Sequence, residues 1–256
     1  MSTAEGAGTR SPLAVADLTE EGLLAALTPL LPRARRELVG TGDDCAVLAA
    51  PDARYCVSTD LLVEGHHFST GWSSPQEIGA RAAAQNLADV AAMGARPVAL
   101  VVGLVLPPAT PLPWVQDLAR GMARVCERAG AGVVGGDLSA GEKLVISITA
   151  FGYCPGPVVL RDGSRPGDVI AVSGTLGFSY AGLDLLEGGF VSPSARGLGE
   201  LGDLETFVST YRAPSPPLGS GVAAAAAGAR AMMDLSDGPA ADASRPVPPY
   251  GSHSKQ

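Results

Sequence analysis

Apolar residues gather in short runs along the first three fifths of the chain, and turn-forming residues separate these runs. The runs are rich in Val, Ile and Leu, which favour β-strands over helices of such short length. They alternate with longer segments of small and amphipathic residues that have a helical period. The predicted strands comprise residues 55–63, 98–106, 132–134 and 144–151.

Helix signals lie before and between these strands. Ser74, Pro75 and Glu77 match a capping box with proline at the first helical position, and so mark the start of a long helix. The predicted helices comprise residues 20–31, 75–93 and 112–129. The strands are apolar enough to need cover on both faces, and two helices cover only one face. We therefore expect a mixed sheet with helices on one face that pairs sheet to sheet in a homodimer.

The pattern restarts near residues 155–157, Pro-Gly-Pro, where we place a domain boundary. Beyond it we expect strands over residues 169–173 and 231–237, helices over 179–186 and 218–228, and a loose insertion over 188–202. The fold class is therefore α+β or α/β, with an incomplete second α/β domain. The predicted parts are a disordered leader (1–13), an N-terminal domain (14–156), a partial C-terminal domain (157–245) and an unstructured tail (246–256).

Polar residues interrupt the first strand in the run Ser58-Thr59-Asp60. Burying a carboxylate is costly unless it is paired or binds a metal. Asp44, in the Gly-led turn just upstream, can converge on the same point. Mg²⁺ prefers oxygen ligands of these kinds. The alternative is a polar strand end beside a loop, with Asp44 capping a turn.

Further polar residues stand in small-residue surroundings. Asn86 and Asp89 share one face of the expected 75–93 helix, where a carboxylate is better explained as a metal ligand than as part of a solvated stripe. Gly136 and Asp137 follow a short strand, where a glycine lets the backbone approach a ligand. The two aspartates of residues 234–238, Asp-Leu-Ser-Asp-Gly, end the last expected strand.

Adjacent His66 and His67 would point to opposite faces of a strand, and His253 is the only other histidine, so a zinc site is excluded. One of the pair can contact a substrate phosphate; otherwise both are surface residues. The loop of residues 174–177, Gly-Thr-Leu-Gly, can hold phosphate through backbone N–H groups or form only a tight turn.

Composition narrows the class of partner. A formal net charge of −8 disfavours nonspecific binding to nucleic acid and to anionic membranes. The four scattered cysteines form no Cys-x-x-Cys pair and fit a reducing cytoplasm. The start of the chain has no signal-peptide core, and the longest apolar run, residues 98–106, is too short to span a bilayer. An acidic protein that handles phosphates needs metal ions to bridge like charges.

The order of these motifs closely resembles the thiamine-monophosphate kinase family, which belongs to the aminoimidazole ribonucleotide synthetase-like ATP-binding superfamily. The resemblance covers roughly residues 19–245. Its motifs are Gly-Asp-Asp at 42–44, Ser-Thr-Asp at 58–60, Val-Glu-Gly-His-His-Phe at 63–68, the run 86–95, Gly-Gly-Asp at 135–137, Arg161 with Pro-Gly-Asp at 166–168, and Asp-Leu-Ser-Asp-Gly at 234–238.

The resemblance implies transfer of the ATP γ-phosphoryl group to thiamine monophosphate by a homodimer that uses several Mg²⁺ ions. It implies that His67 contacts the substrate and that Gly136, Asp137, Arg161 and Ser236 contact ATP. No side chain is assigned as a catalytic base, because a phosphate monoester with a second pKa of about 6 is already an anion. The implied magnesium ligands are Asp44, Ser58, Thr59, Asp60, Asp89, Asp137, Asp234 and Asp237.

The sequence departs from the family pattern after residue 238, where Pro239 replaces the usual Leu. The family's later Gly-Gly-Glu-Asp-Tyr-Glu segment and C-terminal aromatic have no counterpart here. We therefore expect impaired substrate binding and a loosely packed second domain. Two alternatives stay open: a hydrogenase-maturation or purine-synthesis type of ATP enzyme, and a catalytically inactive nucleotide-binding remnant.

Overall fold

The computed structural model describes residues 13–40 and 46–244. The predicted leader before residue 13, Asp44 with its Gly-led turn, and the predicted tail lie outside the described residues.

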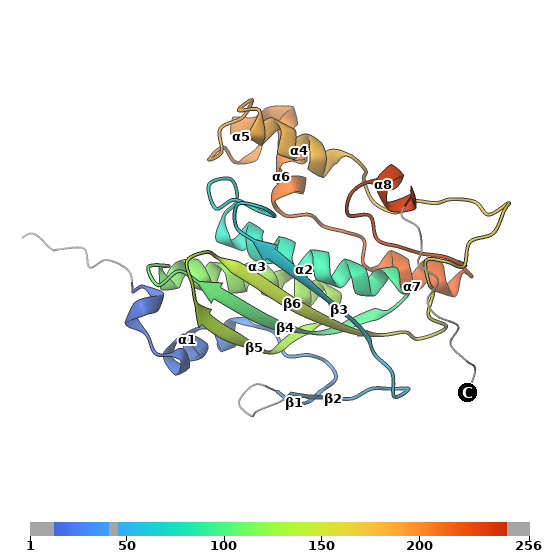
Figure 1. Ribbon diagram of the computed structural model, residues 1–256, viewed down its shortest axis with the longest axis horizontal. Helices are drawn as coiled ribbons and strands as arrows, with labels where there is room; N and C mark the ends of the chain where they lie inside the picture. The colour runs from blue at the N-terminus through green and yellow to red at the C-terminus, as the bar shows by residue number, and fades with distance from the viewer. Residues whose placement is uncertain (1–12, 41–45, 245–256) are drawn as a thin grey trace, which may run out of the picture.

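A four-stranded mixed sheet with the order β3–β6–β4–β5 lies at the centre of the molecule (Figure 1). β6 pairs antiparallel with both β3 and β4, whereas β4 and β5 are parallel. The helix between β4 and β5 makes the crossover that parallel neighbours require. The strands are β3 (Cys56–Val63), β4 (Arg96–Leu106), β5 (Gly132–Ala140) and β6 (Val145–Tyr153), with a separate small pair, β1 (Glu37–Val39) and β2 (Val47–Leu48).

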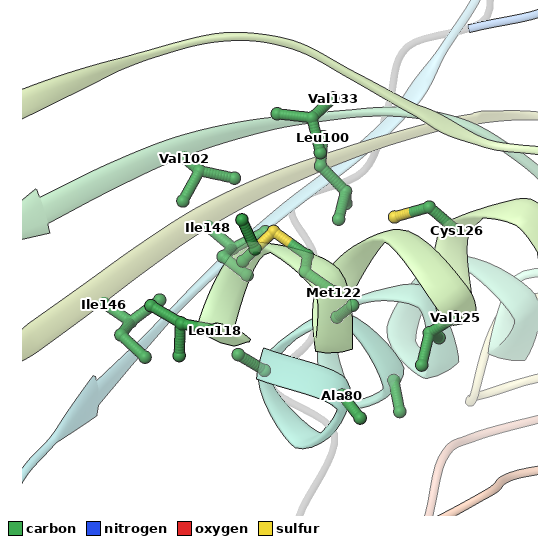
Figure 2. Close-up of a cluster of buried hydrophobic side chains, with 14 of the residues drawn as sticks. Ala80, Leu100, Val102, Leu118, Met122, Val125, Cys126, Val133, Ile146 and Ile148 are labelled. Atoms are coloured by element: carbon green, nitrogen blue, oxygen red, sulfur yellow. The ribbon is translucent and has the colours of Figure 1, made fainter. Parts of the chain in front are cut away.

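Helices α2 (Pro75–Ala92) and α3 (Leu112–Ala129) cover one face of this sheet. The capping box forms as predicted: the Glu77 N–H donates to Ser74 Oγ at 3.3 Å, and the Ser74 N–H donates to the Glu77 carboxylate at 2.7 Å. Figure 2 shows aliphatic side chains of β4, β5 and β6 packed against α3 and Ala80 of α2. The prediction of a mixed sheet with helices on one face is thus confirmed.

The two covering helices touch at their backbones. A Cβ on Gly79 of α2 would overlap the Leu118 carbonyl oxygen, and a Cβ on Gly121 of α3 would overlap the Gln76 carbonyl oxygen. Each helix therefore needs glycine where it crosses the other. This close approach sets the distance between α2 and α3.

The opposite face of the sheet is more open. The segment that carries Ala34 and β2 packs on one end of this face, against residues such as Val98 and Val134. Elsewhere on this face Val57 and Leu61 are 58% and 50% exposed. Figure 1 places the β1–β2 pair on this side of the sheet, whereas Leu23 and Leu27 of α1 (Glu20–Leu27) belong to the core that contains α2 and α3. None of the described helices has the length and apolar character that crossing a membrane requires.

Residues 157–244 contain helices and no strand among the described residues. The predicted strands over residues 169–173 and 231–237 are wrong: both segments are irregular, and Val169 and Ile170 are 92% and 93% exposed. Neither segment has a neighbouring strand to satisfy its backbone hydrogen bonds. The helices are α4 (Phe178–Glu187), α5 (Gly197–Leu201), α6 (Glu205–Arg212), α7 (Gly219–Ala226) and α8 (Pro239–Ser244).

These helices form two groups. α4, α5 and α6 enclose a small cluster around Leu186, Val208 and Tyr211, and they lie beyond α2 as seen from the sheet (Figure 1). α7 packs directly on the end of α2, where Gly221 approaches the Ala91 carbonyl oxygen. The predicted helices over 179–186 and 218–228 correspond to α4 and α7, whereas α6 was not predicted.

Candidate functional site

The Ser58-Thr59-Asp60 run lies in the middle of β3, and its side chains alternate between the two faces of the sheet. Ser58 and Asp60 face α2, as the buried Leu62 does. Thr59 faces the open side, where its hydroxyl donates to the Ile148 carbonyl oxygen at 3.0 Å. The structure therefore separates the Thr59 hydroxyl from the other two predicted ligands.

Asp89 of α2 meets the side chains of β3. The Ser58 hydroxyl donates to the Asp89 carboxylate at 2.9 Å, and the Gln85 amide donates to Asp60. Asn86, by contrast, is fully buried, and its amide donates to the Ala82 carbonyl oxygen of its own helix. The predicted shared face thus carries only Asp89 to the site, because the 60° between the two positions turns Asn86 into the core.

The pKa of Asp89 is raised above its ordinary value. The pKa of Asp89 is raised to about 6, chiefly by burial and also by the nearby Asp234 and Asp60 carboxylates, while the hydrogen bond from Ser58 acts to lower it. A half-buried carboxylate beside two others favours a proton or a cation at this point. The sequence prediction of an acidic cluster is therefore matched by Asp60, Asp89 and Asp234.

Asp234 reaches this cluster from the second half of the chain. The segment before it runs beside residues 160–163: the Met232 N–H donates to the Leu160 carbonyl oxygen at 3.2 Å, and Gly163 lies against the Arg230 carbonyl oxygen. Residues 159–163 are in turn tied to the end of α2, because the Val159 N–H donates to the Met93 carbonyl oxygen at 3.3 Å. Arg161 lies exposed next to this junction.

Asp242, which the sequence analysis did not single out, holds the loop of Ser236, Asp237 and Gly238. The backbone N–H groups of all three donate to the same oxygen of Asp242, each at 3.0 Å. Asp242 is only 3% exposed, although it lies on the short helix α8. A carboxylate that accepts several N–H bonds fixes the loop backbone firmly. The sequence offers one sign of this role: Asp242 lies four residues after Gly238 and three after Pro239, a proline that can start a helix.

Asp137 lies on the open face and not at the end of a strand, because β5 continues to Ala140. It is paired in register with Gly103 and accepts a hydrogen bond from the Ser139 hydroxyl at 3.2 Å. Gly136 lies against β4, where a Cβ would overlap the Val102 carbonyl oxygen. The predicted strand end is therefore wrong, and Gly136 has a structural reason to be glycine.

His66 and His67 lie in a turn after β3 and not in a strand as expected. His67 is exposed, and its Nδ1 accepts a hydrogen bond from the Val63 N–H at 3.0 Å, which leaves Nε2 directed elsewhere. The carbonyl oxygen of His67 accepts from Nη1 of the buried Arg81 at 2.8 Å, and the Arg81 guanidinium stacks on Tyr211 at 4.2 Å. This turn is thus fastened to both α2 and α6.

The donors present suit a hard cation. Asp60, Asp89 and Asp234 offer carboxylate oxygens, and a cation between them would relieve the repulsion that raises the pKa of Asp89. Across residues 13–40 and 46–244, however, no three His, Cys, Asp or Glu side chains converge closely enough to bind a metal ion by themselves. Mg²⁺ commonly keeps water and phosphate oxygens in its shell, so fewer protein ligands suffice.

Comparison with known proteins places the chain in a family. It is 45% identical over 217 residues to the thiamine-monophosphate kinase of Mycobacterium tuberculosis, which covers 83% of this chain and 62% of that protein. It is 31% identical over 228 residues to the thiamine-monophosphate kinase of Bacillus subtilis, covering 88% of this chain and 69% of that protein. The chain belongs to the thiamine-monophosphate kinase family. The AIR synthase related protein N-terminal domain family matches residues 42–154.

A solved structure, AaThiL complexed with AMPPCP and TMP, shares the fold with a TM-score of 0.67 and 35% sequence identity. The match covers 78% of this chain and 62% of that chain. The described chain therefore has the fold of this family, and the resemblance read from the motifs is confirmed. This chain spans 62% of the length of the mycobacterial relative.

Proposed function

We propose that this protein transfers the γ-phosphoryl group of ATP to thiamine monophosphate, giving thiamine diphosphate and ADP. The observation that carries the proposal is the convergence of Ser58, Asp60, Asp89 and Asp234 from three separate segments, in a chain of this family. A clustered set of carboxylates has no evident structural benefit, because mutual repulsion and burial both disfavour it.

Mg²⁺ bound here would neutralise the charge of the transferred phosphoryl group, which is the main electrostatic need of phosphoryl transfer. Asp60, Asp89 and Asp234 would hold the ion, with the Ser58 hydroxyl orienting Asp89. Asp242 keeps the Ser236–Gly238 backbone in one shape through three hydrogen bonds. Asp44, Thr59, Asp137 and Asp237 remain proposed magnesium ligands, and Thr59 and Asp137, which face the open side of the sheet, would bind a different ion from the one that Asp89 holds.

The predicted ATP contacts also remain proposals. Arg161 is exposed beside the 230–232 segment, and Ser236 lies in the loop that Asp242 holds, so both are near Asp234 along the chain or across a backbone hydrogen bond. Gly136 and Asp137 lie on β5, away from Asp89. His67, with Nδ1 engaged by the Val63 N–H, would present Nε2 to the acceptor phosphate.

A homodimer through the open face of the sheet is part of this proposal. Val57 and Leu61 are exposed there, and adjacent exposed apolar residues on a strand face are typical of a surface that another protein surface covers. Sedimentation of the full chain should give a dimer that Leu61→Lys dissociates, while Val169→Lys, at an exposed site elsewhere, leaves it intact. A monomeric wild-type chain would rule out this interface.

The described Cys56, Cys126 and Cys154 are free thiols, and we therefore propose a cytoplasmic protein. The domain boundary near residue 156 likewise stays a proposal.

The proposed reaction is tested by incubating the protein with ATP, Mg²⁺ and thiamine monophosphate and separating the thiamine esters. Thiamine diphosphate and ADP should form in equal amounts, and Asp89→Asn should abolish both. Formation of ADP without thiamine diphosphate would contradict the assigned acceptor. No turnover with any acceptor, from a protein that still binds Mg²⁺-nucleotide, would leave the inactive nucleotide-binding remnant as the correct reading.

A further inference from the structure

A cavity of about 830 Å³ lies away from the acidic cluster. It is built where the end of α3, the start of β4 and α7 meet, so it joins the sheet body to the second half of the chain. None of the residues that line it belongs to the candidate phosphoryl-transfer site. Its size falls within the range of small-molecule sites.

The charge of the cavity is opposite to that of the protein. Four arginines line it, Arg35, Arg36, Arg96 and Arg128, and the described lining residues include no Asp or Glu. The whole chain, by contrast, has 26 acidic and 18 basic residues outside histidine. No ion pair to any of the four arginines is present in the described part of the chain.

Two of the arginines are already oriented by the protein. The Arg36 guanidinium stacks on the Tyr153 ring at 4.2 Å from its centroid. Arg35 lies against Gly130, where an added Cβ would be 3.1 Å from its Cζ. One cation at the C-terminal end of α3 is explained by the helix dipole, but four exceed that need.

The rest of the wall is apolar. Val98 and Val125 line the cavity beside Leu218 and Val222, and prolines border it. A ligand that fits these two kinds of surface has an anionic end and an apolar or ring-shaped end. Arginine is well matched to phosphate because its planar fork gives two parallel hydrogen bonds.

We propose that this cavity binds a small phosphate ester, with the arginines holding the phosphate and the apolar wall holding the organic part. A long polyanion is disfavoured because the net charge of −8 repels it. The ligand would tie Pro214–Gly219 and α7 to the sheet body. This inference does not rest on the proposed kinase activity.

The test is calorimetric titration of the full chain with phenyl phosphate, inorganic phosphate and citrate, in EDTA so that the acidic site holds no metal. Phenyl phosphate should bind most tightly. The double variant Arg96→Gln/Arg128→Gln should lose at least about tenfold in affinity, because two charge-assisted contacts disappear. Arg124→Gln, an exposed arginine of the same helix that does not line the cavity, should bind as the wild type does.

Hydrogen exchange supplies a second measurement. Phenyl phosphate should slow exchange in residues 214–222 of the wild type and not of the double variant. Three results would overturn the proposal: no binding of phenyl phosphate, unchanged affinity in the double variant, or equal affinity for citrate. Equal affinity for inorganic phosphate would overturn the role of the apolar wall.

Discussion

The two halves of the chain bury their apolar residues to different degrees. Up to residue 156, four paired strands and two long helices share one continuous core. Beyond it, the α4–α6 group has a small cluster of its own, while Val169, Ile170 and Phe190 remain largely exposed. The same kinds of apolar run thus have different outcomes, because a strand requires partners that only other segments supply.

The two halves of the chain also contribute differently to the candidate site. The first half supplies a rigid frame with Ser58, Asp60 and Asp89 on it, and the second half supplies Asp234 on an irregular segment. A site that joins a rigid and a less packed region can assemble only when the second region is held in place. Arg81, Asp242 and the α2–α7 contact are the features that hold it.

The largest expected effect comes from glycines at helix crossings. Gly121→Ala should destabilise the whole protein by about 3 kcal/mol, because the new Cβ would overlap the Gln76 carbonyl oxygen at the centre of the helical layer. Gly182→Ala, at the crossing of α4 with α6, should loosen the α4–α6 group alone. Denaturant unfolding with hydrogen exchange read by region separates the two outcomes.

Gly199→Ala is the matched control, because open space surrounds a Cβ at this position in α5. It should leave stability unchanged or slightly raised. If Gly182→Ala destabilised the sheet as much as Gly121→Ala does, the two halves would unfold as one cooperative unit and would not differ in stability.

The sequence predicted the first half well because its signals are local. Capping residues fixed the start of α2, and Gly130 fixed the end of α3. The strand predictions failed at 169–173 and 231–237 because apolar β-formers cannot reveal whether a pairing partner exists. α6 was missed although Phe207, Val208 and Tyr211 have helical spacing.

The site was predicted in composition but not in arrangement. Asp60, Asp89 and Asp234 lie near one another as expected, whereas Asp137 lies within β5 on the open face. Strict alternation along β3 would have separated Thr59 from its neighbours. Asn86 was expected to share a face with Asp89, but its side chain is buried in the core. Asp242 was missed because its role depends on three backbone N–H groups, which no sequence pattern displays.

A smaller effect is expected at Asp242. Asp242→Ala removes the acceptor of three backbone N–H groups and should raise the free energy of the loop by about 2 kcal/mol. Hydrogen exchange at residues 236–238 should accelerate, while exchange in the β3–β6–β4–β5 sheet stays the same. Asp242→Asn keeps an oxygen acceptor, so its exchange rate at residues 236–238 should lie between those of the wild type and the alanine variant. Unchanged exchange in the alanine variant would show that the loop is held by other contacts.

The smallest effect concerns Asp89 and pH. Because the folded-state pKa of Asp89 is raised to about 6, ionisation opposes folding, and this penalty is absent below the unfolded pKa and present above about 6. Metal-free protein should therefore lose stability as pH rises from about 4 to 6. Asp89→Asn should remove that loss and be more stable by about 1 kcal/mol at pH 7, after allowance for partial exposure.

Thermal or denaturant unfolding in EDTA at several pH values measures this difference. The two proteins should have equal stability near pH 4 and diverge above pH 6. A variant that is less stable than the wild type at neutral pH would show that Asp89 is a structural carboxylate and not one kept at a cost to stability.

The central claim is that the carboxylates of both halves bind nucleotide through Mg²⁺. Calorimetric titration with a non-hydrolysable ATP analogue tests it directly, with and without Mg²⁺, in the wild type and in Asp60→Asn and Asp89→Asn. Asp184→Asn, on the exposed side of α4, serves as the control. We expect binding only with Mg²⁺, a loss of at least about tenfold in affinity in each site variant, and no change in the control. Equal affinity with and without Mg²⁺ in all four proteins would contradict the account.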